Sequence, residues 1–432
     1  ESTAISHDVL QKMRREFSFW YPVDLRCSGR DLVQNHLTMS LFTHAAVWED
    51  QKLWPQAFYC NGHVMVDAEK MSKSTGNFLT LEEAIGTYSA DATRISCADS
   101  GDGLQDANFS RETAAKSILR LTTLQSWAED AVARLPSLRT GEMTFLDEIF
   151  DNEISSATER AHEAYTNMVY SDALRAVWFD MENLRSQYSI LTNGDVHTDV
   201  IRRFLDVQMV TLSPIAPHFC EHVWRNVLGK PGLVIDAAWP TPPKAVDKVL
   251  TRQYELIQGT LRSFRLDLDK FMSPKKKKKG GGGPPQKPTR AVIFVAKAYK
   301  PFQQDILRLL QQFELDPDNS PVEKDFMRRI KDSDVMKNMP KTDIKKAMTF
   351  ASFTMGKEVK ARGPEALELE LPFDEVGMLQ SLLEVIKRQL SIEDIEVADA
   401  AEEHALGGEQ KRLAAGPGNP QVAFFAEEPA PA

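Results

Sequence analysis

The sequence predicts a multidomain chain that combines α/β parts with an all-α part. Three observations predict this fold class. Near the start, short apolar runs that suit buried strands alternate with glycine turns and helices, and a long middle stretch carries apolar residues at three- and four-residue spacing. A second mixed segment then follows a run of Lys, Gly and Pro. With 432 residues, 42 % of them hydrophobic, the chain is long enough for about three domains.

The first segment has the pattern of a strand, a glycine turn and a helix. The turn falls at Ser28-Gly29-Arg30-Asp31. The helix that follows is predicted to turn one apolar face toward a core, made by Leu32, Val33, Leu37, Leu41 and Phe42. Residue type alone leaves two interpretations open, because Asp31 and His36 suit a ligand site but also suit a helix cap and a core side chain.

Residues 70–77, Lys-Met-Ser-Lys-Ser-Thr-Gly-Asn, form the most specific motif of the chain. Two lysines three apart, separated by small residues and followed by glycine, predict a cationic loop that can hold a polyphosphate. Residues 58–66 predict a turn entering a short buried strand, and residues 81–88 predict a helix. The loop would therefore lie at a strand exit, the usual ligand position in an open α/β sheet, and this context disfavours an ordinary lysine-rich turn.

In spelling and context, this octapeptide resembles the signature loop of the class I aminoacyl-tRNA synthetases. The resemblance implies that residues 1–77 are the carboxyl-side half of a Rossmann-like catalytic domain. It implies ATP as a substrate with Mg²⁺, Lys73 as the first contact for the leaving phosphates and Lys70 as the second. Three further residues of the loop, Met71, Ser72 and Ser74, would complete the ATP cradle.

Residues 28–37, Ser-Gly-Arg-Asp-Leu-Val-Gln-Asn-His-Leu, resemble more narrowly the leucyl-tRNA synthetases of the eukaryotic and archaeal cytosolic type. In this family Gly29, Asp31 and His36 match the places that approach the ATP. The resemblance implies a cytoplasmic leucine–tRNA ligase, which activates leucine with ATP to leucyl-adenylate and transfers it to tRNA-Leu. Leucine, ATP and tRNA-Leu are the partners it implies.

A helical region follows, and the resemblance divides it in two. Residues 78–114 are similar to the family's segment that contacts the tRNA stem, and residues 115–272 would be the helical bundle that binds the anticodon. Within the bundle one apolar face is predicted from the spacing of Leu174, Val177, Trp178, Met181, Leu184 and Tyr188.

One motif in the bundle points elsewhere. His218-Phe219-Cys220-Glu221-His222 matches a zinc-peptidase pattern that places both histidines on one helical face. Pro217 abuts the first histidine, the sequence offers no identifiable third ligand, and the four cysteines of the chain have no paired spacing. The sequence therefore predicts no protein-bound metal.

The last third of the chain is predicted to hold a linker, a small α/β domain and a disordered tail, with boundaries at 273–289, 290–399 and 400–432. Residues 292–295 predict a buried strand, and a helical stripe follows between Phe302 and Phe313. Residues 367–371 alternate as in a half-buried strand, before a helix near Leu383 and a last strand near 392–397. The domain resembles the C-terminal domain of eukaryotic leucyl enzymes.

A dense run of basic residues lies inside this domain. Although the net charge of −10 argues against a uniformly basic surface, local patches are sufficient for phosphate contacts. The candidates for contact with the tRNA backbone are Arg328, Arg329, Lys341, Lys345 and Lys346. An ordinary solvated helix face is the alternative interpretation.

Two features of the family do not occur in this sequence: a His-Ile-Gly-His-like motif and the editing insertion. We therefore expect the carboxyl-side portion of a synthetase, active only with a separate amino-terminal half, and a multisynthetase assembly is a further conceivable partner. The alternative function is a non-catalytic tRNA-binding or scaffold module. No membrane contact is expected, because no apolar run approaches the ~20 residues of a membrane span.

Overall fold

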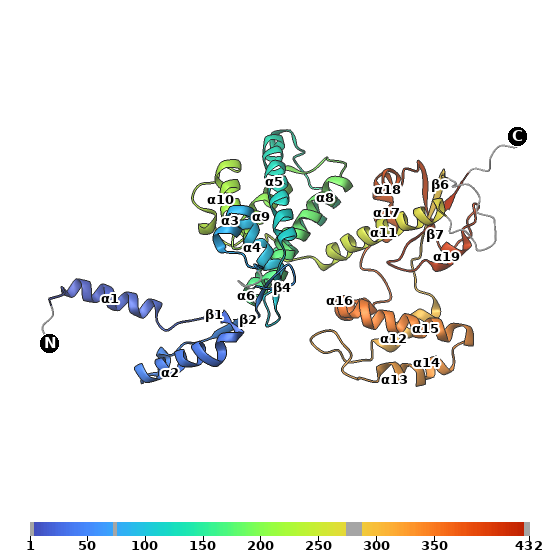
Figure 1. Ribbon diagram of the computed structural model, residues 1–432. Helices are drawn as coiled ribbons and strands as arrows, with labels where there is room; N and C mark the ends of the chain where they lie inside the picture. The colour runs from blue at the N-terminus through green and yellow to red at the C-terminus, as the bar shows by residue number, and fades with distance from the viewer. Residues whose placement is uncertain (1–3, 72–75, 274–286, 427–432) are drawn as a thin grey trace. The chain divides into compact units, whose positions relative to one another are not determined.

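The computed structural model describes residues 4–71, 76–273 and 287–426. It divides into two compact units, residues 1–246 (unit 1) and residues 247–432 (unit 2) (Figure 1). Four residues of the predicted loop, Ser72, Lys73, Ser74 and Thr75, lie outside the described residues.

Unit 1 begins with two small sheets. Its elements there are α1 (His7–Trp20), β1 (Arg26–Gly29), α2 (Thr38–Val47), β2 (Phe58–Asn61), β3 (Val64–Val66), β4 (Glu69–Lys70), α3 (Leu81–Tyr88), α4 (Ala90–Asp99) and β5 (Ala107–Phe109). Strands β1 and β2 pair in parallel, whereas β3 pairs antiparallel with β4 and parallel with β5. The predicted order of strand, glycine turn and helix is confirmed, and so is the helix at 81–88.

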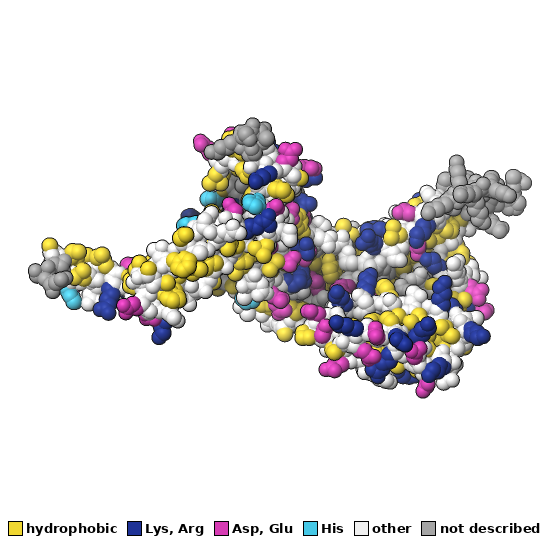
Figure 2. All heavy atoms as spheres, turned by 60° about the horizontal axis from the view of Figure 1, so that its bottom comes forward, with side chains coloured by type: hydrophobic (Ala, Val, Ile, Leu, Met, Phe, Trp, Pro, Cys, Tyr) yellow, Lys and Arg dark blue, Asp and Glu magenta, His cyan; other side chains and the backbone are white. Residues whose placement is uncertain are grey.

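The apolar face predicted for residues 32–42 does not pack into a core of this chain. Leu37 is buried, but Val33, Leu41 and Phe42 are 44 %, 46 % and 68 % exposed. Helix α1 also buries none of its residues, and Figure 2 shows hydrophobic side chains on the surface of this N-terminal part. The predicted helix is therefore present, but the prediction that its stripe faces a core is wrong for these three residues.

The rest of unit 1 is a helical bundle. Its helices are α5 (Arg111–Arg134), α6 (Phe145–Thr166), α7 (Tyr170–Leu174), α8 (Met181–Leu191), α9 (Thr198–Leu212) and α10 (Pro217–His222). A π-helical turn over residues 175–180 joins α7 to α8, so the two helices form one continuous rod. All six residues of the predicted apolar face are at most 6 % exposed, which confirms this prediction.

Unit 2 combines one small sheet with helices. Its elements are α11 (Lys248–Met272), β6 (Arg290–Val295), α12 (Pro301–Leu310), α13 (Phe326–Asp332), α14 (Asp334–Lys337), α15 (Lys341–Phe353), α16 (Lys360–Arg362), α17 (Glu375–Ser381), α18 (Leu383–Leu390), β7 (Asp394–Asp399), α19 (Glu409–Ala414) and β8 (Gln421–Phe425). The central strand β6 pairs in parallel with β7 and antiparallel with β8. The strands predicted at 292–295 and 392–397 are thus confirmed, each with slightly different ends.

Two predictions for unit 2 are wrong. Residues 367–371 form no strand, because a 3₁₀ turn over Gly363–Leu367 places Leu367 in the core beside α12 while Glu368 stays exposed. The segment 400–432 is not a disordered tail up to residue 426, because α19 forms and β8 completes the sheet at the edge of β6. Buried strand β6 needs hydrogen-bond partners on both edges, and β8 supplies one of them.

The boundary between the compact units lies before α11, not in the predicted linker at 273–289. Helix α11 packs against α18 and β8, although the predicted bundle extends to residue 272. Most of that linker, residues 274–286, lies outside the described residues.

Candidate functional site

The predicted nucleotide site lies at the carboxyl ends of β1 and β2. Gly29, the last residue of β1, pairs with Asn61, the last residue of β2. A Cβ atom at Gly29 would lie 2.6 Å from the Asp31 carboxylate oxygen Oδ1, so the Asp31 side chain folds back over the glycine. Because the carboxyl ends of parallel strands form the usual ligand edge of an α/β sheet, Gly29 and Asp31 are in the expected position.

His36 lies in a short π-helical turn, Val33–Leu37, and is exposed. Its Nε2 atom contacts the guanidinium of Arg26, the first residue of β1. His36 is thus not a core residue, which leaves its imidazole near the strands and accessible to a ligand.

Sequence reasoning missed a cluster that joins the two sheets. Arg30 donates from Nη1 to the carbonyl of Leu104 at 2.9 Å and forms an ion pair from Nη2 with Asp106 Oδ1 at 2.9 Å. The backbone N–H of His63 donates to the same Asp106 oxygen at 2.9 Å. This hydrogen bond, with the nearby Arg30, lowers the pKa of the Asp106 carboxyl. The sequence alone does not indicate this cluster, because the partners of Arg30 lie 33 or more residues away along the chain.

Gly62, between β2 and β3, lies close to the backbone of the loop that precedes β5. Its N–H donates to the Gly103 carbonyl at 3.2 Å, and a Cβ atom there would lie 2.1 Å from the Gln105 carbonyl oxygen. A side chain at position 62 would therefore collide with backbone, which explains the glycine physically.

The base of the predicted phosphate loop is a hairpin made by β3 and β4. Asp67 and Ala68 form its turn with positive φ values of 51° and 65°, and Lys70 pairs with Met65. On the far side of the loop, the Asn77 amide Nδ2 donates to the Val66 carbonyl at 3.2 Å. Both ends of segment 71–76 are therefore tied to one hairpin, with Lys70 exposed and Met71 half-buried.

The two parts of the predicted ATP site are not joined by direct contacts in the described residues. No hydrogen bond or ion pair there links Lys70 to Gly29, Asp31 or His36.

Helix α4 fixes the site segment to the bundle. The buried Asp91 carboxylate accepts a hydrogen bond from the Phe219 N–H at 2.6 Å and so caps α10 from another helix. Arg94 donates to the carbonyls of Ile215 and Pro214 at 2.8 and 2.7 Å, just beyond the end of α9. Hydrogen bonds of Asp91 and Arg94 therefore hold α4 against the bundle.

A buried polar network organises the bundle itself. Asp147 is 0 % exposed and accepts hydrogen bonds from Arg139 at 2.7 and 2.8 Å, from Thr144 at 2.7 Å and from the Tyr188 hydroxyl. Burial alone would raise the pKa of Asp147, but the bonds from Tyr188 and Arg139 outweigh it, so the pKa is lowered. Burial, together with the hydrogen bond to Asp147, raises the pKa of the Tyr188 phenol. This network is structural, since it lies inside the bundle.

The predicted basic residues of unit 2 lie on α13 and α15. Arg328 and Arg329 form ion pairs with Asp332 and Glu323, and Lys346 pairs with Asp343 at 3.2 Å. In Figure 2, basic and acidic side chains are intermixed over this part of the surface. Among the predicted candidates within the described residues, Lys341 and Lys345 form no ion pair, so they are the cations most available to a phosphate.

The residues of the zinc-peptidase pattern have other partners. Glu221 Oε2 accepts a hydrogen bond from the Val234 N–H at 2.8 Å, and His222 contacts Asn226 at 3.0 Å. No group of three or more His, Cys, Asp or Glu in the described ranges is arranged to hold a metal ion. The described helices also include none that is long and apolar enough to cross a membrane.

Two family models match this chain. The model of the class I (C) tRNA synthetase catalytic domain matches residues 10–115, which include β1, β2 and the loop at 70–77. The model of the anticodon-binding domain of tRNA ligases matches residues 147–279, which include α6 to α11. The first match overlaps the predicted catalytic half and also covers residues 78–114, and the second lies mostly within the predicted anticodon-binding bundle.

Similar curated proteins are leucine–tRNA ligases. The cytoplasmic leucine–tRNA ligase of Pongo abelii is 38 % identical over 93 % of this chain and 34 % of its own length. Those of Arabidopsis thaliana and Dictyostelium discoideum are 38 % and 36 % identical over 93 % and 98 % of this chain. The chain spans 34 to 39 % of the length of these three relatives. It belongs to the class I aminoacyl-tRNA synthetases, and within them to the leucine–tRNA ligase family.

Proposed function

We propose that this chain provides the carboxyl-side part of a cytoplasmic leucine–tRNA ligase. The proposed reaction activates leucine with ATP to leucyl-adenylate and then transfers the leucyl group to tRNA-Leu. The observation that carries the proposal is the loop at 70–77, which lies inside the matched catalytic segment and has both ends anchored on the β3–β4 hairpin. A chain that only bound RNA would have no physical need for this loop.

In the first step, a leucine carboxylate oxygen attacks the α-phosphorus of ATP, and pyrophosphate leaves as the bond to the β-phosphate oxygen breaks. Charge stabilisation and positioning dominate such a step. Lys73 is the first residue and Lys70 the second that we assign to the leaving phosphates, with Met71, Ser72 and Ser74 shaping the loop. Mg²⁺ would enter with the ATP phosphates and offset part of their charge.

The strand ends would hold the other part of ATP. Gly29 has no side chain, so the Asp31 carboxylate can lie against its backbone, and this carboxylate can accept hydrogen bonds from ribose hydroxyls. His36 is exposed next to the same strand and can contact the nucleotide. These roles fit residues 1–77 as the carboxyl-side half of a Rossmann-like catalytic domain.

The remaining parts would bind tRNA-Leu. We assign residues 78–114 to the stem contact, because α4 is locked to the bundle by Asp91 and Arg94 and can keep the loop at a fixed distance from it. The helical bundle would bind the anticodon arm, as the matched family model indicates. In unit 2, Lys341 and Lys345 are the main candidates for phosphate contacts, with Arg328, Arg329 and Lys346 in support.

Charging of tRNA-Leu with labelled leucine tests this proposal. The reaction would contain this chain and a polypeptide that carries the amino-terminal half of a family member with the His-Ile-Gly-His-like motif. We expect charging that falls by about 100-fold or more in Lys73→Ala, since one charge-stabilising group is worth that much. The matched control is Lys52→Ala, an exposed lysine of the same segment, which should charge normally.

Two results would redirect the proposal. Equal charging by Lys73→Ala and the unaltered chain would remove the loop from catalysis. Absence of charging together with retained tRNA binding in a gel-shift assay would favour the alternative function, a tRNA-binding module derived from a synthetase.

A further inference from the structure

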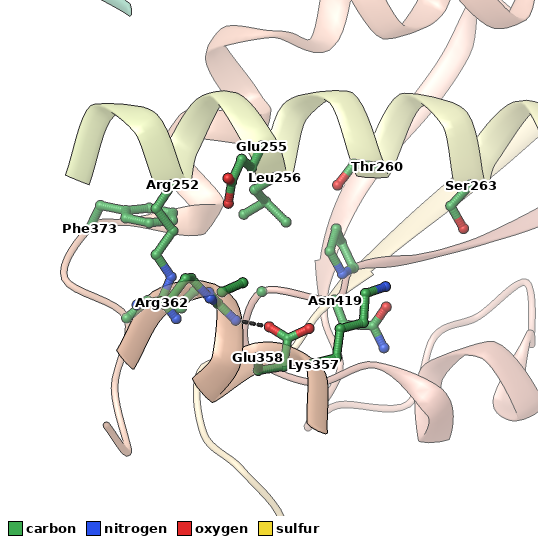
Figure 3. A pocket seen from close by; sticks show the side chains of 15 residues that line it. Arg252, Glu255, Leu256, Thr260, Ser263, Lys357, Glu358, Arg362, Phe373 and Asn419 are labelled. Atoms are coloured by element: carbon green, nitrogen blue, oxygen red, sulfur yellow. Dashed lines mark ion pairs between the residues drawn. The ribbon is translucent and has the colours of Figure 1, made fainter. Parts of the chain in front are cut away.

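A cavity of about 500 Å³ lies in unit 2, away from the residues discussed above. One wall is helix α11, which presents Arg252, Glu255 and Thr260. The opposite wall is the helical segment over residues 357–362, which presents Glu358 and Arg362 (Figure 3). Figure 3 shows the side chains from both walls pointing toward the space between them. The volume falls within the roughly 300–1,000 Å³ that is typical of small-ligand pockets.

A buried hydroxyl in this wall has no partner. Thr260 is 4 % exposed, and its Oγ1 atom makes no hydrogen bond to any described residue. Leaving a buried hydroxyl unpaired costs free energy, so such groups are usually satisfied by a ligand or by water. A partner that enters the cavity would supply the missing hydrogen bond.

The cavity also has guanidinium groups at one end. Arg362 forms an ion pair with Glu358, whereas the Arg252 guanidinium makes no ion pair or hydrogen bond within the described part of the chain. Burial lowers the pKa of the Arg362 guanidinium, and the nearby charge of Arg252 lowers it further. Two neighbouring guanidiniums repel each other, and an anion between them would relieve the repulsion.

Acceptors and hydroxyls lie further along the same wall. Glu255 lies one helical turn after Arg252 and is exposed to the cavity, and Thr260 and Ser263 follow at helical spacing. The Glu255 carboxylate would repel a phosphate group, but it can accept hydrogen bonds from ligand hydroxyls. Along α11, the cavity wall therefore presents first a guanidinium, which suits an anion, and then a carboxylate and hydroxyls, which suit ligand hydroxyls.

We propose that this cavity is a binding site for a sugar phosphate. Arg252 and Arg362 hold the phosphate, since guanidinium groups bind phosphate through paired, charge-assisted hydrogen bonds. Glu255 accepts hydrogen bonds from sugar hydroxyls, and the Thr260 hydroxyl pairs with the ligand. Phe373 forms an apolar boundary beside the phosphate end.

Isothermal titration of the full chain with ribose 5-phosphate tests the proposal. We expect Arg252→Gln to weaken binding by about tenfold or more, the loss expected when a charge-assisted hydrogen bond is removed. The matched control is Arg262→Gln, an exposed arginine on the same helix that does not line the cavity, and it should bind like the unaltered chain. Unchanged binding by Arg252→Gln, or no detectable binding at millimolar concentration, would overturn the proposal.

Two further measurements distinguish binding of the phosphate from binding of the sugar and distinguish lost binding from misfolding. Inorganic phosphate should bind more weakly than ribose 5-phosphate, and equal affinity would overturn the assignment of the sugar. Thr260→Val keeps the shape of the side chain but removes the hydroxyl, so it should weaken binding of the sugar phosphate without lowering the melting temperature. A variant that keeps full affinity would show that Thr260 does not face the ligand.

Discussion

The N-terminal segment and the helical bundle of unit 1 use apolar residues in opposite ways. Helices α1 and α2 bury none of their residues, and Phe42 is 68 % exposed. In the bundle, α9 buries most of its residues, and Leu174 and Leu205 are at most 1 % exposed. The bundle therefore has its own hydrophobic core, whereas the two sheets of the N-terminal segment are linked to each other by polar contacts such as Arg30 with Asp106.

The residues proposed to bind ATP and the core that stabilises unit 1 therefore lie in different parts of the chain. The proposed ATP residues lie in the segment with little core, where side chains such as Asp31, His36 and Lys70 are exposed. A polypeptide that covers the apolar faces of α1 and α2 would add stability to the segment and bring the missing part of the active site, which is what the proposed amino-terminal half would do.

The largest effect on stability is expected from breaking the buried network of the bundle. Asp147→Ala would leave the Arg139 guanidinium without its buried partner and should destabilise unit 1 by about 3–5 kcal/mol. Asp195→Ala is the matched control, because Asp195 also pairs with Arg139 at 3.4 Å but is 72 % exposed, and it should cost about 0–1 kcal/mol. Urea unfolding followed by circular dichroism measures both changes in unfolding free energy. Equal changes in the two variants would contradict a stabilising role of the buried Asp147 network.

A pair of apolar truncations tests the comparison directly. Leu174→Ala in the bundle core should cost about 2–5 kcal/mol of unfolding free energy, because it leaves a cavity. Phe42→Ala in α2 should change the free energy by no more than about 0.5 kcal/mol in this chain alone, because its side chain is mostly in solvent. If Phe42→Ala proved as costly as Leu174→Ala, the N-terminal segment would have a core of its own.

Glu375 extends the comparison to a buried carboxyl with few partners. It is 5 % exposed, one oxygen accepts a hydrogen bond from the Gly418 N–H at 3.0 Å, and the other has no partner among the described residues. Burial raises the pKa of Glu375 to about 7 from its ordinary value of 4.5, in contrast to Asp147, whose pKa is lowered. The protonated form is therefore favoured in the folded state.

The raised pKa of Glu375 makes the stability of unit 2 depend on pH. Because the pKa is higher in the folded state than in the unfolded state, its contribution to the unfolding free energy is complete below pH 4.5 and is lost as the pH rises through about 7. The loss is at most about 3 kcal/mol. Glu375→Gln should remove this part of the pH dependence of unit 2 between pH 4.5 and 8. Unfolding curves measured at both ends of this range would show it, and an unaltered slope in the variant would contradict the buried, protonated carboxyl.

The smallest effect is expected at the connection between α4 and the bundle. Asp91→Ala removes the carboxylate that caps α10 and should cost about 1 kcal/mol, the usual value of a lost helix cap. The matched control is Asp99→Ala at the end of α4, the helix that also contains Asp91, and it should have little effect on stability. Thermal unfolding measures the difference, and a similar melting temperature for Asp91→Ala and the unaltered chain would show that the cap does not hold α4.

The sequence predicted the elements that have strong periodicity and missed those that depend on distant partners. The rod that contains Leu174 and Tyr188 was predictable, since one face repeats at helical spacing. Strand β8 was not, because the low-complexity composition around it is typical of disorder, and only its pairing with β6 makes it a strand. The alternation at 367–371 was misleading, because these residues follow a 3₁₀ turn over Gly363–Leu367 and belong to none of the described strands.

The candidate site shows the same division. Gly29 and Asp31 are neighbours in the chain, so their closeness could be predicted. Both ends of the loop at 70–77 contact the short β3–β4 hairpin that directly precedes the loop. The contacts of Arg30 with His63 and Asp106 could not be predicted, because they depend on how two sheets meet. The roles proposed for Ser72, Lys73 and Ser74 come from the sequence.

Leucine-dependent exchange of pyrophosphate into ATP tests the proposed ligase most directly. The measurement would compare this chain alone, the amino-terminal half alone and the two mixed. We predict exchange only in the mixture, dependent on leucine and abolished by Lys73→Ala. Absence of exchange in the mixture, although the two polypeptides bind each other and tRNA-Leu, would contradict the proposal that this chain carries half of an adenylate-forming site.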